Sequence, residues 1–279
     1  LPWSESLIER FADKWDWKWL SRNDSAIKLF NSWTKQEIST ALERIRSAHC
    51  KDNPSSGEDD VPSPVNMVAV KAIWNWADKH NISKDDIPRE KDALLNLKRL
   101  SFINLNYIGE KQFTSLPKEI GNLKKLILLQ LGDIINEEMV LNRLTELPIE
   151  ICELPKLAYL HLQRNALKEL PAWIGNLTKL KELKLGGNFL TSLPKEIGKL
   201  EKLEVLTIWQ NNLEEIPKEI GFLKNLRGLD ISFNKLTKLP NEITNLTELK
   251  IFLYDDEKVQ LSEEQKKWVT KLKNNGCEL

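Results

Sequence analysis

The stretch LKELKLGGNFLTSLPKEIGKL, residues 180–200, decides the fold, because almost the same phrase returns along the chain every 23 residues. One asparagine and one proline show this period most clearly. The leucines keep the same phase, with an alternating pair at Leu183 and Leu185. The repeated positions are Asn165, Asn188, Asn211 and Asn234 for the asparagine, and Pro148, Pro171, Pro194, Pro217 and Pro240 for the proline.

Each phrase predicts one short structural unit. The alternation of Leu183 and Leu185 predicts a strand that turns both leucines inward. An inward amide at Asn188 needs partners, since a buried unpaired amide costs about 1–3 kcal/mol. Its donors and acceptor together can bridge the backbones of neighbouring units. Pro194 is expected at the first position of a short helical turn, and Gly198 is expected to let the chain turn.

A period in the twenties with this leucine pattern is the sequence signature of a leucine-rich repeat solenoid. One unit cannot bury its own apolar side, so the units stack, and their strands line up in parallel on one concave face. The prediction is therefore an α/β fold. It is a right-handed solenoid of about seven repeats, with an N-terminal helical unit and a C-terminal helical cap.

Pattern and composition divide the chain into five parts. The tryptophans near the N-terminus either fill the core of a small helical unit or form a binding platform. A stretch rich in proline and acidic residues follows them and predicts a linker or mobile loop. The last helix is expected to begin with a capping box at Ser262 and Gln265. The parts are 1–50, a Trp-rich helical unit; 51–64, the linker; 65–95, an N-terminal helical cap; 96–254, the repeats; and 255–279, the C-terminal cap.

The first two repeats are longer than the others. Ile103 and Leu105 are expected to be the inward pair of the first strand. Insertions then fall at 107–112 and 132–142, both just after a strand and so on the same edge. Insertions in solenoids often lie by the binding face, although a tolerant loop also drifts in length without any function.

Charge and hydropathy exclude several classes of partner. The chain carries 41 Lys and Arg against 41 Asp and Glu, and neither end forms a basic arm, which disfavours nucleic acid and anionic membranes. No apolar run approaches the roughly 20 residues that span a bilayer. Cys50, Cys152 and Cys277 lie far apart and indicate no disulfide framework, with Cys152 expected to be a packed thiol. This favours a cytoplasmic protein, with a secreted effector as the alternative.

The outward positions of the strands form the candidate binding surface. An aromatic residue such as Trp209, exposed on a strand beside polar neighbours, is typical of an interface hot spot. The alternative is that scattered apolar surface residues have no role. The predicted partner-binding residues are Phe102, Leu128, Tyr159, His161, Lys184, Val205, Thr207, Trp209 and Asp230.

Motifs for catalysis are missing from the sequence. It contains no Gly-rich phosphate loop and no nucleophile elbow. The histidines, His49, His80 and His161, are too far apart along the chain to suggest a local metal motif. No catalytic residue, cofactor or metal is therefore expected, and the chain is predicted not to be an enzyme.

Two phrases carry a resemblance to known families. LPKEIGKL at 193–200 and LPKEIGNL at 116–123 resemble the 23-residue repeats of bacterial leucine-rich repeat proteins and of the Ras-suppressor type. The opening PWSESLIERFADKWDW, residues 2–17, resembles a Trp-rich segment that precedes repeats in other bacterial proteins. The resemblance implies a bacterial origin and protein–protein binding without catalysis, usually on the concave face. Some bacterial members of the family are delivered into host cells.

Three hypotheses for function follow from these observations. The first is a monomeric, non-catalytic module that binds a protein partner on the concave face. The second is an exported protein that recognises a carbohydrate or another envelope ligand, or an effector that binds a host protein. The third places the function in the Trp-rich unit, with the repeats as a spacer.

Overall fold

The computed structural model describes residues 67–102, 113–132 and 143–279. The chain divides into two compact units, Leu1–Asp60 and Val61–Leu279, and every described residue belongs to the second. The predicted Trp-rich unit and linker, together with the 107–112 insertion and nearly all of the 132–142 insertion, lie outside the described residues.

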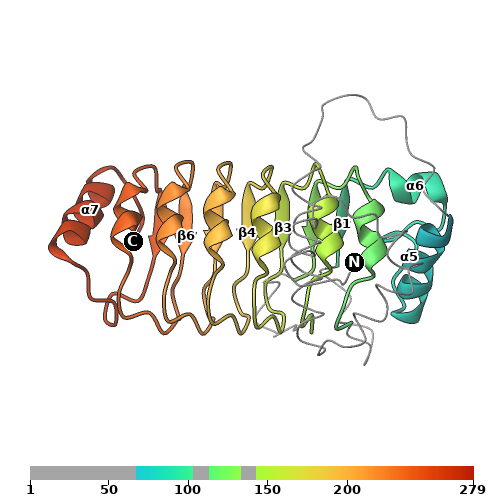
Figure 1. The fold of residues 1–279 in the computed structure, drawn as a ribbon, viewed down its shortest axis with the longest axis horizontal. Helices are drawn as coiled ribbons and strands as arrows, with labels where there is room; N and C mark the ends of the chain where they lie inside the picture. Colours follow the sequence, from blue (N-terminus) through green and yellow to red (C-terminus); the bar gives the residue numbers. More distant parts are fainter. Residues whose placement is uncertain (1–66, 103–112, 133–142) are drawn as a thin grey trace, which may run out of the picture. The chain divides into compact units, whose positions relative to one another are not determined.

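The second unit is a stack of coils whose strands form one seven-stranded sheet, ordered as in the chain (Figure 1). All neighbouring strands are parallel, and the central residue of each pairs with the central residue of the next, as Leu160 does with Leu183. This confirms the predicted leucine-rich repeat solenoid. The strands are β1 Arg99–Ser101, β2 Leu128–Gln130, β3 Tyr159–His161, β4 Glu182–Lys184, β5 Val205–Thr207, β6 Gly228–Asp230 and β7 Ile251–Leu253.

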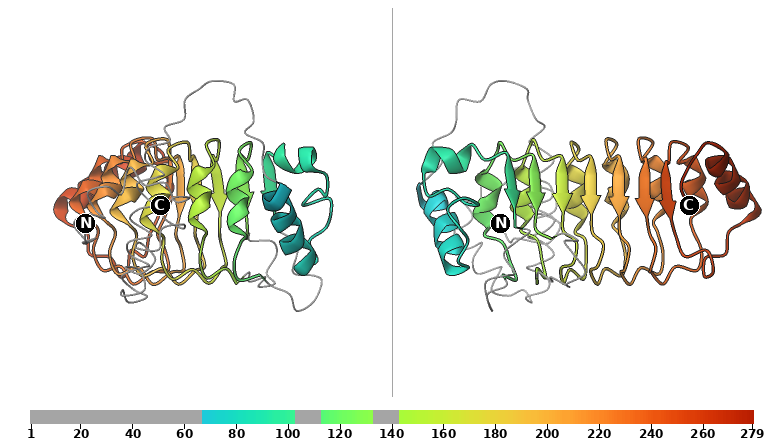
Figure 2. Two further views of the ribbon diagram at one scale, coloured as in Figure 1. Left: turned by 45° about the vertical axis from the view of Figure 1, so that its right-hand side comes forward. Right: turned by 180° about the vertical axis from the view of Figure 1, so that it is seen from behind.

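Between each strand and the next, a short 3-10 helix lies on the opposite side of the coil, as the front and back views show (Figures 1 and 2). Pro194 precedes its helix with φ −69°, and its carbonyl accepts the N–H of Ile197 at 3.0 Å. The proline therefore stands one residue before the position predicted for it, where its fixed φ suits the extended entry. The helices are η3 Lys118–Asn122, η4 Ile149–Glu153, η5 Ala172–Asn176, η6 Lys195–Lys199, η7 Lys218–Phe222 and η8 Asn241–Asn245.

The core between strands and 3-10 helices is a column of leucines and isoleucines. Leu183, Leu185, Ile197 and Leu200 are fully buried in one coil, and their equivalents are buried in the coils on either side. Each coil therefore covers the apolar side of its neighbour, as a solenoid requires.

The repeated asparagines join successive coils through three kinds of hydrogen bond. The amide of Asn188 donates to the carbonyl of Leu185 in its own coil and to that of Leu162 in the coil before, both at 2.9 Å. Its oxygen accepts the N–H of Leu167 at 3.1 Å. The predicted bridging role is confirmed, and Asn165, Asn211 and Asn234 make the same contacts.

The glycines of the 3-10 helices allow neighbouring coils to approach closely. A Cβ on Gly198 would lie 2.7 Å from the carbonyl oxygen of Glu219 in the next coil. The backbone of Gly198 has no positive φ, so the predicted role in turning the chain is wrong. A glycine is needed because the next coil leaves no room for a side chain. Cys152 occupies the equivalent position two coils earlier. It is disulfide-bonded, so the expectation of a packed thiol is also wrong.

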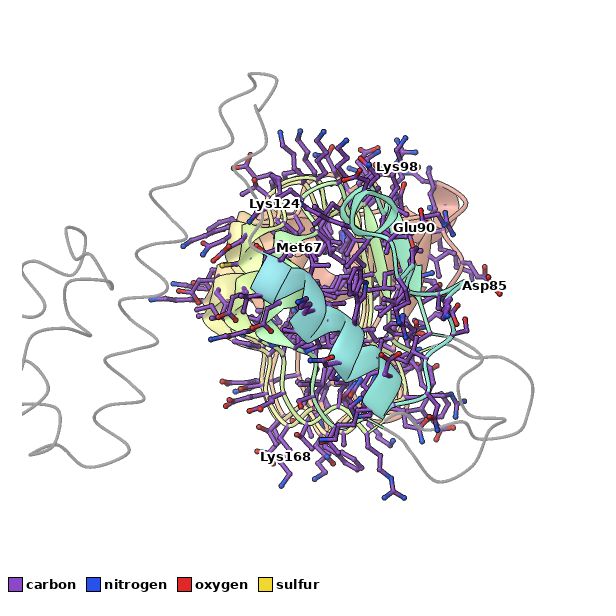
Figure 3. The ribbon with its side chains drawn as sticks, turned by 90° about the vertical axis from the view of Figure 1, so that its right-hand side faces the viewer. Met67, Asp85, Glu90, Lys98, Lys124 and Lys168 are labelled. Carbon is purple, nitrogen blue, oxygen red and sulfur yellow. The ribbon has the colours of Figure 1, made fainter. Side chains whose placement is uncertain are left out.

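Helix α5, Met67–Lys79, crosses the first end of the stack and contacts η3 (Figure 3). It buries Val70, Ile73 and Ala77, spaced for one helical face. Trp76 beside them donates from Nε1 to the carbonyl of Ser115 at 3.1 Å. A short helix, α6 Lys91–Leu95, leads from α5 into β1. Val68 of α5 lies off this buried face and is exposed.

The first strand lies three residues earlier in the chain than predicted. Leu100 pairs with Leu129, so Leu100 and Phe102 are the inward pair in place of Ile103 and Leu105. Phe102 is 1% exposed, and its ring lies 5.9 Å from Trp76 and 5.7 Å from Phe113. The prediction that Phe102 faces a partner is therefore wrong.

Helix α7, Glu263–Asn274, covers the other end of the stack. The predicted capping box of Ser262 and Gln265 is confirmed. Trp268 is buried against the ring of Phe252 and donates from Nε1 to the carbonyl of Leu246 at 3.0 Å. The last residues then run beside β7, where the N–H of Phe252 donates to the carbonyl of Glu278 at 2.8 Å. The end of the chain therefore occupies the edge of the sheet.

Candidate partner-binding surface

The strand face is the outward side of the sheet, formed by the residues on either side of the buried centre of each strand. Three-residue strands with buried centres leave two outward positions each. The strand face therefore consists of Arg99, Ser101, Leu128, Gln130, Tyr159, His161, Glu182, Lys184, Val205, Thr207, Gly228, Asp230, Ile251 and Leu253.

The register brings most of the predicted residues together in two rows. Tyr159 pairs with Glu182 and Glu182 with Val205, which makes the first row. The second row joins the residues at the other ends of the same strands, His161, Lys184 and Thr207, and continues to Asp230. Trp209 lies two residues beyond Thr207. Of these predicted residues, Tyr159, Lys184, Val205, Thr207, Trp209 and Asp230 are half-exposed.

Two other predicted residues lie on the strand face but are covered. Leu128 is 5% exposed and His161 is 9% exposed. Their outward register is as expected, but burial limits the area that either side chain offers to a partner. The exposed part of the predicted surface therefore extends from Tyr159 over β4 to Trp209.

A shared carboxylate joins three side chains at the centre of this area. Oε2 of Glu182 lies 3.1 Å from Nε2 of His161 and 3.2 Å from Nζ of Lys184. Sequence reasoning selected the two bases and missed Glu182. The signal was present, because Glu182 and Lys184 flank Leu183 and so share one side of the strand.

Beyond the strand ends, the indole of Trp209 lies against Gly186 of the coil before, which has no side chain. A Cβ on Gly186 would overlap Nε1 and Cε2 of the indole. The guanidinium carbon of Arg164 lies 5.5 Å from the ring centre of Trp209, within the range of a cation–π contact. Sequence reasoning missed Arg164, whose position in the repeat lies just before the asparagine and is occupied by Gly187 in the next coil.

Three buried polar atoms on the coils around β4 have no hydrogen-bond partner. Gln163 Oε1, Arg164 Nε and Thr207 Oγ1 are the buried side-chain atoms in the described part of the chain that have no hydrogen-bond partner. Buried polar atoms without a hydrogen-bond partner are uncommon in folded proteins, so each one needs a physical explanation. Gln163 and Arg164 follow β3, and Thr207 belongs to β5, so the three atoms flank β4 and its following glycines.

Two other acidic side chains near the sheet, Asp230 and Asp255, accept hydrogen bonds from this chain. Asp230 accepts hydrogen bonds from the N–H and the hydroxyl of Ser232 at 3.1 and 2.6 Å. Asp255, at the position equivalent to Ser232, accepts the N–H groups of Phe233 and Asn234 at 3.0 and 3.3 Å. These carboxylates stabilise the backbone after the strands.

Metal and membrane features were also sought. Across 67–102, 113–132 and 143–279, no cluster of three or more His, Cys, Asp or Glu side chains is arranged to hold a metal ion. Within the same ranges, no helix combines the length and the apolar character needed to cross a bilayer.

Comparison with protein families identifies the class. The model described as a leucine-rich repeat region matches residues 89–209 and 183–274, more than half of the chain. The chain therefore belongs to the leucine-rich repeat proteins. A search of the curated proteins finds no match.

Solved structures of leucine-rich repeat proteins resemble this chain. A Leptospira interrogans protein is 36% identical over 66% of the chain, with a TM-score of 0.47, and the chain spans 49% of its length. Internalin C2 of Listeria monocytogenes is 24% identical, with 78% of this chain and 87% of that chain covered and a TM-score of 0.54. The ectodomain of the Arabidopsis thaliana receptor kinase GASSHO1/SCHENGEN3, solved with CASPARIAN STRIP INTEGRITY FACTOR 2, is 32% identical. That match covers 63% of this chain and 20% of the receptor, with a TM-score of 0.50.

Proposed function

We propose that this chain is a non-catalytic interaction module that binds a protein partner on the strand face. One observation carries the proposal: Tyr159 on β3 and Trp209 just after β5 are both half-buried on the outward side of the sheet, two coils apart with β4 between them. Aromatic side chains are enriched at interfaces because they offer large apolar area with a polar edge. A protein partner that covers both rings would remove from water a surface that is otherwise unfavourable.

The surroundings of the two aromatic residues support the same function. Between them lie Lys184 and Glu182, paired with each other, and Val205, so a polar centre is flanked by apolar area. Leucine-rich repeat proteins generally bind protein partners, and the plant ectodomain was solved with a partner bound. Partners from the same cell and from a host are both candidates, so the experiment uses two sources of partner.

The test compares partners captured by the intact chain and by two variants. The first is Tyr159→Ala with Trp209→Ala, which removes both rings from the strand face. The second is Phe222→Ala, which removes a ring that is 56% exposed on η7, across the coil from the strands. Extracts of the producing organism and of cells it contacts are each passed over the three immobilised proteins, and the bound proteins are quantified by mass spectrometry.

We expect partners retained by the intact chain and by Phe222→Ala to be lost from the double variant, with affinity lower by about tenfold or more, as for hot-spot residues. Circular dichroism establishes that both variants are folded. A folded double variant that holds the same partners with unchanged affinity would refute the proposed surface.

A further inference from the structure

Arg164 has a charge that the described protein does not neutralise. The charged side chains Glu182, Lys184 and Asp230 are each in a hydrogen bond or an ion pair, but in the described ranges no carboxylate pairs with Arg164. Its Nε lies buried with no hydrogen-bond partner. A guanidinium has five N–H donors, and leaving buried donors unused is unfavourable. The terminal nitrogens, for which the described ranges show no partner, are therefore available to a group from outside the chain.

The side chain is nevertheless held in a defined place. Its guanidinium lies 5.5 Å from the ring centre of Trp209. A Cβ on Gly187, which has φ +69°, would come within 3.2 Å of Cγ of Arg164. Gly186 leaves room for the indole in the same way. Gly186 and Gly187 thus leave room for Trp209 and Arg164 to pack against the backbone. Because the Arg164 side chain is already ordered, less conformational entropy is lost when a ligand binds.

The sign of the free charge selects the chemistry of the ligand. Glu182 is shared by Lys184 and His161, and the nearby Asp230 accepts from Ser232. The charge without a counterpart is therefore positive. The planar fork of an arginine matches a carboxylate, with two parallel hydrogen bonds.

We propose that Arg164, held against Trp209 over Gly186 and Gly187, binds the carboxylate of an Asp or Glu side chain of the partner protein. This inference rests on the function proposed above and specifies the chemistry of the partner. Trp209 would cover the apolar part of that acidic side chain while the terminal nitrogens of Arg164 hold its oxygens.

The test uses random 12-residue peptides displayed on phage, selected against the full chain, so that no natural partner has to be known. The test variant is Arg164→Gln. Gln210 is the natural residue at the equivalent position two coils later and has φ 52°, almost the same as the φ of 53° at Arg164. The variant therefore suits the local backbone. The matched control is Arg99→Gln, which removes an exposed cation from β1 on the same strand face.

We expect peptides selected by the intact chain to be enriched in Asp or Glu at one fixed position. A selected peptide is then made with blocked ends, once with its acidic residue and once with the matching amide. Calorimetry should show that Arg164→Gln weakens binding of the acidic peptide by about tenfold or more, as for a hydrogen bond to a charged group. The same variant should leave binding of the amide peptide unchanged, and Arg99→Gln should leave both unchanged.

Three outcomes would overturn the inference, and they differ in what they say of the proposed function. Selected peptides that lack an acidic preference, but that need Tyr159 and Trp209, would reject the role of Arg164 and keep the binding surface. Peptides that bind independently of all three residues would reject both. An equal loss for acidic and amide peptides in Arg164→Gln would show that Arg164 supports the surface without binding a carboxylate.

Discussion

The side-chain oxygen of Asn211 accepts the backbone N–H of Leu190, one coil earlier, at 2.9 Å. The same amide donates to the carbonyls of Leu185 and Ile208, both at 3.0 Å. Two of these three bonds, to Leu190 and Leu185, cross to the coil before, and the third holds Asn211 to its own coil.

The first prediction concerns this connection. Asn211→Ala leaves the buried N–H of Leu190 without an acceptor and removes the hydrogen bonds that the amide donates, so we expect the free energy of unfolding to fall by about 2–4 kcal/mol. Asn212→Ala changes a half-buried neighbour outside the series of asparagines and should stay within about 0.5 kcal/mol. Urea unfolding followed by circular dichroism measures both, and similar losses in the two variants would contradict the bridging role.

Two glycines should respond to alanine with opposite signs. At Gly198 a Cβ would lie 2.7 Å from the carbonyl oxygen of Glu219, so coils must move apart and we expect a loss of about 1–3 kcal/mol. At Gly228 a Cβ would meet the methyls of Val205 at 3.6 and 3.7 Å, an ordinary contact. Gly228→Ala should stabilise by about 0.4–1 kcal/mol, because it restricts the unfolded chain. Thermal and urea unfolding of both variants check the signs, and a stabilising Gly198→Ala would disprove close packing there.

Phe233 combines exposure with an unfavourable backbone. It is 68% exposed and has φ 54°, a conformation that asparagine adopts more readily than phenylalanine. We expect Phe233→Asn to raise the free energy of unfolding by about 0.5–1 kcal/mol. Phe222→Asn is the control, since Phe222 is also exposed but has no positive φ. If both substitutions gave the same change in chemical denaturation, the backbone explanation would fail.

The pH dependence of stability should include a contribution from Cys277. Burial, helped by the nearby Glu278, raises the pKa of its thiol against the opposing effect of Lys250. A raised pKa in the folded state means that the neutral thiol is favoured there. Its contribution is complete below the unfolded pKa and is lost as the pH rises through the folded pKa. The free energy of unfolding of Cys277→Ala should therefore fall less than that of the unchanged chain between about pH 8 and pH 10. Equal slopes would show that Cys277 does not contribute.

Sequence alone predicted the regular coils well, because each of their positions has a single physical requirement. Asn188 must bridge coils and Leu183 must be buried, so both recur at a fixed interval. The prediction for the first strand was wrong because leucines three residues apart fit two registers. The apolar spacing at 94, 97, 100 and 102 matches the repeat as well as the spacing at 97, 100, 103 and 105. Only the packing of Phe102 against Trp76 and Phe113 distinguishes the two registers.

The binding surface was predictable in outline but not in detail. Alternation identified Tyr159, Lys184 and Val205 as outward residues. It could not show that His161 is covered or that Glu182 joins two bases, because these depend on neighbours from other coils. Arg164 was missed for a similar reason, since its contact with Trp209 is made across 45 positions of the chain.

The equal rungs from Leu160 to Phe252 make the length of this molecule adjustable. Removing residues 184–206 takes out one whole period, so Leu183 would meet Leu229 just as Leu206 now does. A cut one residue shorter would instead shift the phase of everything that follows and expose its leucines. Gene duplication or loss in whole multiples of 23 codons can therefore lengthen or shorten the recognition surface while both capped ends stay as they are.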